Sequence, residues 1–300
     1  MSPVVVFVNP SAGSGRAVSY LPRIRAVFDA ASVTAEFITI RDVQELSSLA
    51  QGAIRSGKQF LFALGGDGTF QGLVNAANGA DVILGVLPAG GGNDFAAALK
   101  LPANPIAATQ AALRGQPKRV DLARARTADG RARLYLGGGG LGIDAEAARL
   151  ASGAFRRLPG RARYVASALG AYWGYRGVGI RAEFPNSELP PIEAKALLAA
   201  VLNTPSYGAG IRLAPDACLE DGWLDFVIVE DLRAREVLAI LPRLLKNGEL
   251  RTPHVRRLRV RTVKLSTDRP SLFHGDGEIL GPSPVEIEIV PQAVRVLAPA

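Results

Sequence analysis

The chain has 300 residues, 48% of them hydrophobic, which is enough for one large domain or two ordinary ones with well-formed cores. Its apolar runs are shorter than the roughly 18 residues that a spanning helix needs, and Asn9 and Pro10 interrupt the first run before it could act as a signal peptide. The single cysteine, Cys218, excludes internal disulfides and suits a cytoplasmic protein. The net charge of +8 favours anionic partners. Arginine supplies most of the positive charge, and a GC-rich genome would explain that arginine content equally well.

The first part of the chain alternates predicted strands with predicted helices. Apolar and β-branched runs predict strands at residues 4–8, 35–40, 60–64 and 82–87, and helical spacing predicts helices at 17–31, 43–56 and 105–114. A further helix is expected to begin near Thr69. This order predicts an α/β domain at residues 1–122, with a doubly wound, Rossmann-like sheet that binds ligands at the carboxyl ends of its strands.

From residue 118 onward, short apolar segments alternate with turns. Strands are predicted at 120–123, 133–136, 180–184, 195–203, 224–229, 256–265, 272–274 and 285–290, with helices at 145–154, 161–175 and 234–246. We therefore expect a C-terminal antiparallel β-sandwich domain with helical insertions over residues 123–291.

Two of the predicted strands end in glycine-rich loops. Residues 65–69 have the sequence Gly-Gly-Asp-Gly-Thr, and residues 88–95 have Pro-Ala-Gly-Gly-Gly-Asn-Asp-Phe. Glycines remove the Cβ atoms that block close approach, and a helix N-terminus presents unpaired N–H groups to an anion. No G-x-x-x-x-G-K-[ST] motif occurs, so backbone amides would hold the phosphate. The alternative is that these glycines only make tight strand-to-helix turns.

Six blocks, in order, resemble the diacylglycerol kinase catalytic-domain superfamily, which covers bacterial lipid kinases and sphingosine kinases, with NAD kinases as more distant relatives. The blocks lie at residues 9–15, 65–69, 88–95, 142–145, 221–225 and 276–278, and so span almost the whole chain. The resemblance implies transfer of the γ-phosphoryl group of ATP to a lipid hydroxyl, such as that of diacylglycerol, in a cleft between the domains. It also implies that residues 292–300 return to complete the first domain.

The resemblance further implies roles for individual residues. Asp67 would serve Mg²⁺ beside the triphosphate, with a helix N-cap as the alternative role. Glu278 would be the general base that takes the proton of the attacking hydroxyl, with a solvated hairpin turn as the alternative. The implied ATP-binding residues are Asn9, Thr39, Gly65, Gly66, Asp67, Gly68, Thr69, Gly90, Gly91, Asn93 and Asp94.

A second, structural Mg²⁺ site is implied around residues 218–225. The Asp221 side chain and the carbonyl groups of Cys218 and Trp223 would hold the ion, and a plain Asp-Gly turn is the alternative. The chain also departs from the family pattern at four positions. Each departure removes or shifts a polar contact, which would weaken nucleotide binding, alter the donor preference or reduce activity. The alternative is that the chain is a relative without catalytic activity. The departures are Gly91 for threonine, Gln71 and Gly72 for Asn-Glu, and Gly137 for asparagine.

These features predict a cytoplasmic lipid kinase that associates peripherally with membranes. Arg257, Arg259 and Arg261 alternate along one predicted strand and would face anionic headgroups together, unless local acids pair with them. The expected partners are ATP, a lipid acceptor and an anionic membrane surface, without nucleic acid, and a homodimer stays open. The alternative functions are a kinase of a soluble hydroxyl compound such as NAD, or a regulator that binds nucleotide or lipid without turnover.

Overall fold

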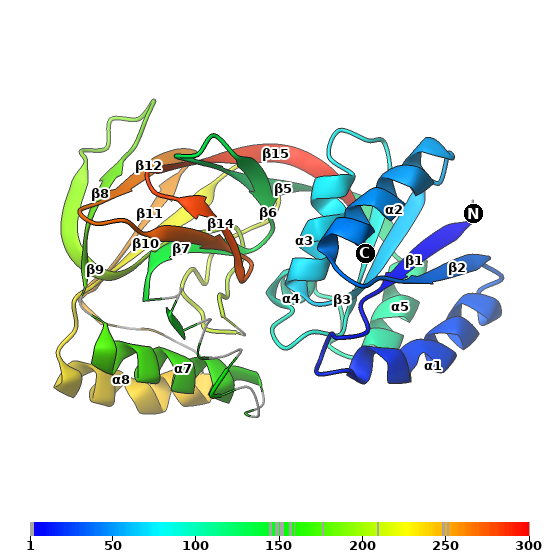
Figure 1. The fold of residues 1–300 in the computed structure, drawn as a ribbon, viewed down its shortest axis with the longest axis horizontal. Coiled ribbons are helices and arrows are strands. Elements are labelled where there is room, and N and C mark those ends of the chain that lie inside the picture. The colour runs from blue at the N-terminus through cyan, green and yellow to red at the C-terminus, as the bar shows by residue number, and fades with distance from the viewer. Residues whose placement is uncertain are drawn as a thin grey trace. The chain divides into compact units, whose positions relative to one another are not determined.

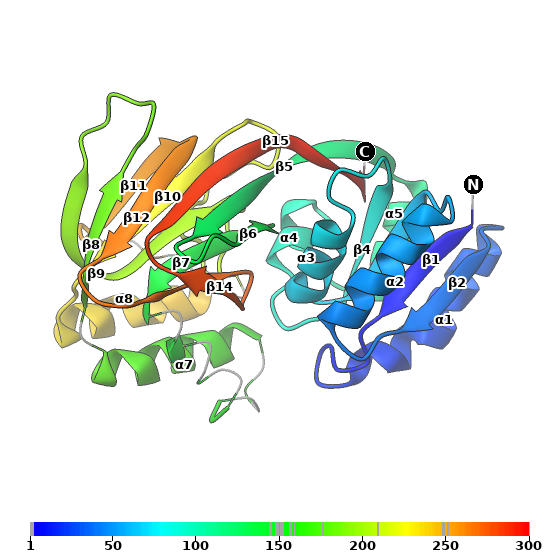
Figure 2. The same cartoon turned by 45° about the horizontal axis from the view of Figure 1, so that its top comes forward.

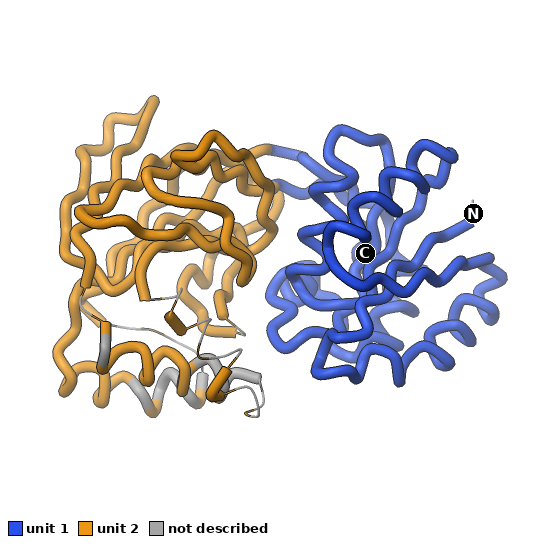
Figure 3. Tube along the Cα trace, in the orientation of Figure 1, with its two compact units in different colours: residues 1–121, 291–300 blue, residues 122–290 orange. Residues whose placement is uncertain are grey.

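The computed structural model divides the chain into two compact units (Figure 3). Unit 1 comprises Met1–Asp121 and Pro291–Ala300, and unit 2 comprises Leu122–Val290. The structure describes residues 3–299 apart from 144–145, 148–149, 151–152, 156–157, 159, 176, 209, 248–249 and 251. Asp144 and Ala145 of the fourth family block, and parts of the helix predicted at 145–154, therefore lie outside the described residues. No helix in the described ranges is long and apolar enough to span a bilayer.

Unit 1 contains a parallel sheet in the order β4-β3-β1-β2, with the last part of β15 beside β4. Every residue of β1 is buried, as expected for a strand covered on both faces. The predicted doubly wound α/β fold is therefore confirmed. The strands are β1 (Val4–Val8), β2 (Ala35–Thr39), β3 (Phe60–Gly65), β4 (Ile83–Pro88) and β15 (Val285–Ala298).

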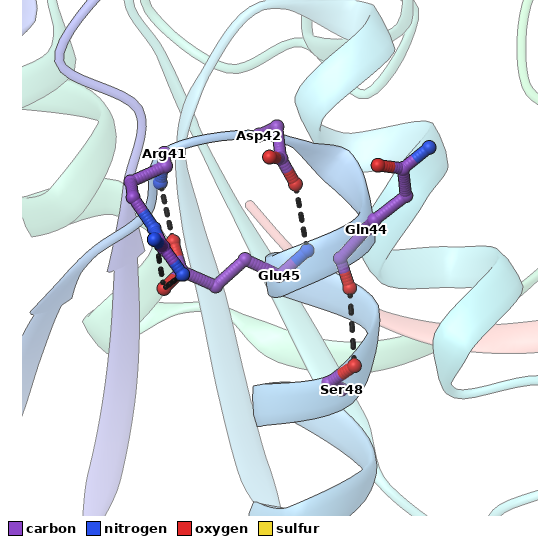
Figure 4. A network of polar contacts seen from close by, with 5 residues as sticks. All are labelled: Arg41, Asp42, Gln44, Glu45 and Ser48. Atoms are coloured by element: carbon purple, nitrogen blue, oxygen red, sulfur yellow. Dashed lines mark hydrogen bonds and ion pairs between the residues drawn. The ribbon is translucent and has the colours of Figure 1, made fainter.

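Helices cover both faces of this sheet (Figure 1). α1 and α5 pack together on one face, and α2 and α3 pack together on the other. The start of α2 is set by the side chain of Asp42, which accepts a hydrogen bond from the Glu45 amide, while Arg41 pairs with the Glu45 carboxylate (Figure 4). The helices are α1 (Arg16–Ala30), α2 (Val43–Arg55), α3 (Asp67–Ala76), α4 (Asp94–Ala98) and α5 (Pro105–Arg114).

Unit 2 is built from antiparallel strands around a core that includes Tyr135, Phe226 and Phe273. Strand β9 is central, because β7, β8 and β10 all pair with it. The predicted antiparallel β-rich half is confirmed, but the strand predicted at 256–265 is two strands that part at Arg261. The strands are β5 (Gln116–Thr127), β6 (Ala132–Tyr135), β7 (Gly138–Gly142), β8 (Val178–Glu183), β9 (Ile192–Leu202), β10 (Leu224–Glu230), β11 (Val255–Val260), β12 (Thr262–Thr267), β13 (Leu272–Gly275) and β14 (Glu278–Pro282).

Two helices of unit 2, α7 (Gly160–Gly174) and α8 (Ala234–Asn247), lie side by side next to its strands, as Figures 1 and 2 both show. The hydroxyl of Tyr172, near the end of α7, donates to the carbonyl of Leu232 just before α8, at 2.7 Å. Beneath the helices, Leu198 and Leu202 of β9 and Val227 of β10 form a second buried cluster. The helices predicted at 161–175 and 234–246 are present.

Candidate active site

The loops that follow β1 and β3 meet where the strand order of the parallel sheet reverses. Ligands bind at the carboxyl ends of strands at such a switch point. Asn9, directly after β1, donates from Nδ2 to Oγ1 of Thr69 at 2.8 Å, and its amide donates to the carbonyl of Leu64 at 3.0 Å. Two motifs 60 residues apart in the sequence are thereby joined. Thr39, exposed at the end of β2, lies opposite Val8 in register and is thus beside the same strand end.

The loops that follow β3 and β4 also touch. The amide of Ala89 donates to the carbonyl of Gly65 at 2.7 Å, and a Cβ atom on Gly90 would lie 2.5 Å from the Cα atom of Gly66. Asn93 closes the second loop, accepting from the Gly90 amide at 2.9 Å and donating to the Gly90 carbonyl at 3.0 Å. Gly66 and Gly90 are therefore needed for the contact between the loops.

Several backbone amides of these loops could bind an anion. The amides of Thr69 and Phe70 donate to the carbonyl of Gly66. The amides of Gly66, Gly68, Gly91 and Gly92, in contrast, have no hydrogen-bond partner within the described part of the chain. Gly66 and Gly68 belong to the N-terminal end of α3, where the helix dipole favours negative charge. The arrangement suits a phosphate held by backbone.

Asp67 links the two glycine-rich loops. The N-cap of α3 is Gly66, so Asp67 does not cap its own helix. Its carboxylate instead accepts hydrogen bonds from the amides of Asp94, at 3.1 Å, and Phe95, at 3.2 Å, which begin α4. The sequence did not reveal this second-loop partnership. It fixes a carboxylate, the oxygen ligand that Mg²⁺ prefers, beside the unpartnered amides.

The β13–β14 hairpin of unit 2 holds the two carboxylates of the sixth family block differently. Asp276 accepts hydrogen bonds from three successive amides, of Leu136 at 2.6 Å, Gly137 at 2.9 Å and Gly138 at 3.3 Å. Glu278 is exposed at the start of β14, and its side chain has no partner among the described residues. Asp276 thus anchors the turn that presents Glu278, a role that sequence reasoning missed.

Burial raises the pKa of Tyr135 well above its usual range, and the nearby charge of Asp276 adds to the effect. The tyrosine is therefore neutral, and its hydroxyl donates to the carbonyl of Val201 at 3.0 Å beneath the hairpin. This side chain supports the anchor and has no accessible hydroxyl to offer a substrate.

Asp221 is occupied by partners other than a metal. One carboxylate oxygen accepts from the Trp223 amide at 3.0 Å, and the other is paired with the guanidinium of Arg259. Arg261 lies 4.8 Å over the Trp223 ring, so a second positive charge is close by. A divalent cation bound to Asp221 would have to displace the guanidinium group of Arg259 and would lie near the positive charge of Arg261. The described contacts fit an ion-paired Asp-Gly turn, and the structural Mg²⁺ site implied at Asp221 and the carbonyls of Cys218 and Trp223 stays a prediction.

Asp225 gives this region a pH dependence. Burial raises its pKa from 3.8 to about 6, against the opposing attraction of Arg259. The folded protein therefore binds this proton more tightly than the unfolded chain, so its stabilising effect is present below about pH 4 and is lost as pH rises through about 6.

We expect Asp225→Asn to raise the melting temperature relative to wild type more at pH 7.5 than at pH 5, in buffer with chelator. The exposed Asp29→Asn is the control, and equal differences at both pH values would contradict the expectation.

The arginines predicted to face a membrane are engaged within the chain. Arg257 donates to the carbonyls of Leu213, at 2.6 Å, and Leu250, at 3.0 Å. Arg259 pairs with Asp221, and both Arg259 and Arg261 lie over the ring of Trp223. These contacts favour the alternative of local pairing for this strand.

Packing accounts for two departures from the family pattern. A Cβ atom on Gly72 would lie 2.8 Å from Cγ1 of Val43, so this position of α3 is set by its contact with α2. A Cβ atom on Gly137 would lie 2.9 Å from the hydroxyl oxygen of Thr204. Gln71 is buried in α3, whereas Gly91 is exposed.

An α/β unit with glycine-rich loops at its switch point, followed in the chain by an antiparallel β unit, is the architecture of diacylglycerol kinase-like proteins. Residues 3–125 match the family model of the diacylglycerol kinase catalytic domain, and residues 139–298 match the YegS C-terminal NAD kinase beta sandwich-like domain. The chain belongs to the diacylglycerol kinase catalytic-domain superfamily.

Curated relatives agree with this assignment. A diacylglycerol kinase of Mycobacterium tuberculosis (strain CDC 1551 / Oshkosh) is 29% identical over 99% of this chain and 95% of its own length. A probable YegS-like lipid kinase of Chromohalobacter salexigens is 30% identical over 84% of this chain and 79% of its own length. The crystal structure of a putative diacylglycerol kinase from Bacillus anthracis has the same fold, with a TM-score of 0.79 at 20% identity, over 99% of this chain and 97% of that one.

Proposed function

We propose that the chain transfers the γ-phosphoryl group of ATP to the hydroxyl of a diacylglycerol-like lipid. The observation that carries the proposal is a group of amides, at Gly66, Gly68, Gly91 and Gly92, that have no hydrogen-bond partner among the described residues and lie beside the fixed carboxylate of Asp67. Relatives that carry the name diacylglycerol kinase over nearly their full length support the lipid acceptor. The proposal assigns the nucleotide to residues 1–122 with 292–300, and the lipid to residues 123–291.

The chain's residues divide the work of phosphoryl transfer. The loop amides, with Asn9, Thr39, Asn93 and Asp94 around them, would hold and orient the triphosphate. Glu278 would accept the proton of the lipid hydroxyl while the hydroxyl oxygen forms a bond to the γ-phosphorus of ATP. The bond between the γ-phosphorus and the β–γ bridging oxygen breaks, which releases ADP. Asp67 would hold Mg²⁺, which neutralises charge on the phosphates when bound. Its oxygen donors and its place beside the phosphate amides fit that ion.

A soluble acceptor is the second candidate. The model matched by residues 139–298 is described as NAD kinase beta sandwich-like, and this description gives weak support to a kinase of a soluble hydroxyl compound. The same loops and the same base would serve either acceptor, so the acceptor must be identified by assay.

The decisive assay incubates the purified chain with γ-labelled ATP, MgCl₂ and either mixed micelles of diacylglycerol, ceramide or sphingosine, or soluble NAD. We expect label in the organic phase with diacylglycerol and none in NAD. Label in NAD would establish the second candidate. Saturable ATP binding without transfer to any acceptor would overturn the kinase proposal in favour of a regulator.

A further inference from the structure

The outward face of α7 is apolar over its described length. Ala162, Ala166, Leu169 and Trp173 fall within one narrow arc of the helix, whereas Ser167 and Ala171 on the other side are buried, and Val165 is buried at one edge of the arc. The Trp173 side chain is 71% exposed, the highest value among the large apolar side chains described. An exposed tryptophan within an apolar stripe is a mark of an interaction surface.

The neighbouring helix α8 adds apolar and basic side chains to this surface. Its exposed described residues recur at helical spacing and contain no acid: they are Arg235, Leu238, Ala239, Pro242 and Lys246. Leu238 is 59% exposed. The one acidic residue in its first turn, Glu236, is turned to other partners, since its carboxylate contacts His254 at 3.2 Å and accepts from the Arg233 amide at 2.7 Å.

The two exposed faces belong to one layer. α7 and α8 pack on each other, and Tyr172, directly before Trp173, reaches the chain just ahead of α8. We define the α7–α8 face as an apolar stripe with basic side chains, made of Ala162, Ala166, Leu169 and Trp173 on α7 and Arg235, Leu238, Pro242 and Lys246 on α8. The two helices that carry it lie side by side in Figures 1 and 2.

We propose that the α7–α8 face docks this chain on an anionic lipid bilayer. Tryptophan is enriched at the membrane–water interface, where its ring lies among the headgroups, and basic residues on an interfacial helix pair with acidic lipids. A second copy of the chain is a poorer occupant, because a two-fold interface through this face brings like positive charges together. The proposal gives the kinase its route to an insoluble acceptor and to that extent rests on the proposed function; docking itself needs no turnover.

The experiment measures co-sedimentation with vesicles of phosphatidylcholine, with and without phosphatidylglycerol. Wild type is expected to bind the anionic vesicles more tightly, and Trp173→Ser with Leu238→Ser should weaken that binding about tenfold, because interfacial affinity scales with buried apolar area. Arg235→Gln with Lys246→Gln should flatten the salt dependence. Val18→Ser, at a position 45% exposed on α1, is the matched control and should bind as wild type does.

Two results would overturn the docking proposal. The first is unchanged vesicle binding by the Trp173→Ser, Leu238→Ser variant with an unchanged melting temperature. The second is conversion of a dimer to a monomer by the same variant in sedimentation velocity, which would make the face a subunit interface. Because vesicle binding is measured without ATP, a failed kinase assay does not affect this result. Docking is separated from catalysis if the Trp173→Ser, Leu238→Ser variant phosphorylates a short-chain soluble diacylglycerol at the wild-type rate.

Discussion

Replacing Glu278 by glutamine is expected to lower kcat by about 10²–10⁴-fold, the usual contribution of a general base, while the Kd for ATP stays near the wild-type value. The amide has the same size as the carboxyl group but accepts no proton. Glu278 is exposed at the start of β14 and has no side-chain partner within the described ranges, so the fold does not depend on it. Steady-state kinetics in mixed micelles and calorimetric titration with ATP measure the two quantities.

The control for this substitution is Glu286→Gln. Glu286 is an exposed glutamate on β15 of the same unit, and the same loss of charge there should leave kcat unchanged. A Glu278→Gln enzyme with wild-type turnover would remove Glu278 from the mechanism and leave the hairpin as a solvated turn.

The parallel sheet of unit 1 was predictable because β1, β3 and β4 are continuous apolar runs, the pattern of strands that are buried on both faces. The neighbours of the antiparallel strands were not. β9 pairs with β7, β8 and β10, and no local sequence pattern encodes which strands become its neighbours. Arg257 and Arg259 lie on β11 as predicted, but the strand ends before Arg261, and the partners of Arg257 and Arg259 come from segments distant in the sequence.

In the candidate site, the glycine-rich loops were predictable and the partners of the acids were not. Spacing alone located residues 65–69 and 88–95 after two neighbouring strands. The carboxylate of Asp67, however, binds amides 27 and 28 residues away, and that of Asp276 binds amides about 140 residues away. Backbone amides are present at every residue except proline, so their use as partners leaves no trace in residue identity.

Replacing Asp67 by asparagine is expected to lower kcat about 100-fold or more, because metal-borne charge stabilisation at a transferring phosphoryl group is worth several kcal/mol. The melting temperature should fall by a few degrees as well. The Asp67 carboxylate accepts from two amides, whereas asparagine offers one acceptor oxygen and would turn its NH₂ group toward the other amide, at a cost of about 1–3 kcal/mol. Kinetics over a range of Mg²⁺ concentrations and thermal melts measure the two effects.

Asp42→Asn separates the catalytic effect from the structural one. Asp42 also holds a backbone amide, that of Glu45, but it does so as the N-cap of α2, where asparagine serves about as well as aspartate. We expect this control to keep both turnover and melting temperature. If Asp67→Asn lowers the melting temperature but its kcat and Mg²⁺ dependence remain those of wild type, Asp67 only ties α4 to the loop after β3, and the metal must be held by other groups.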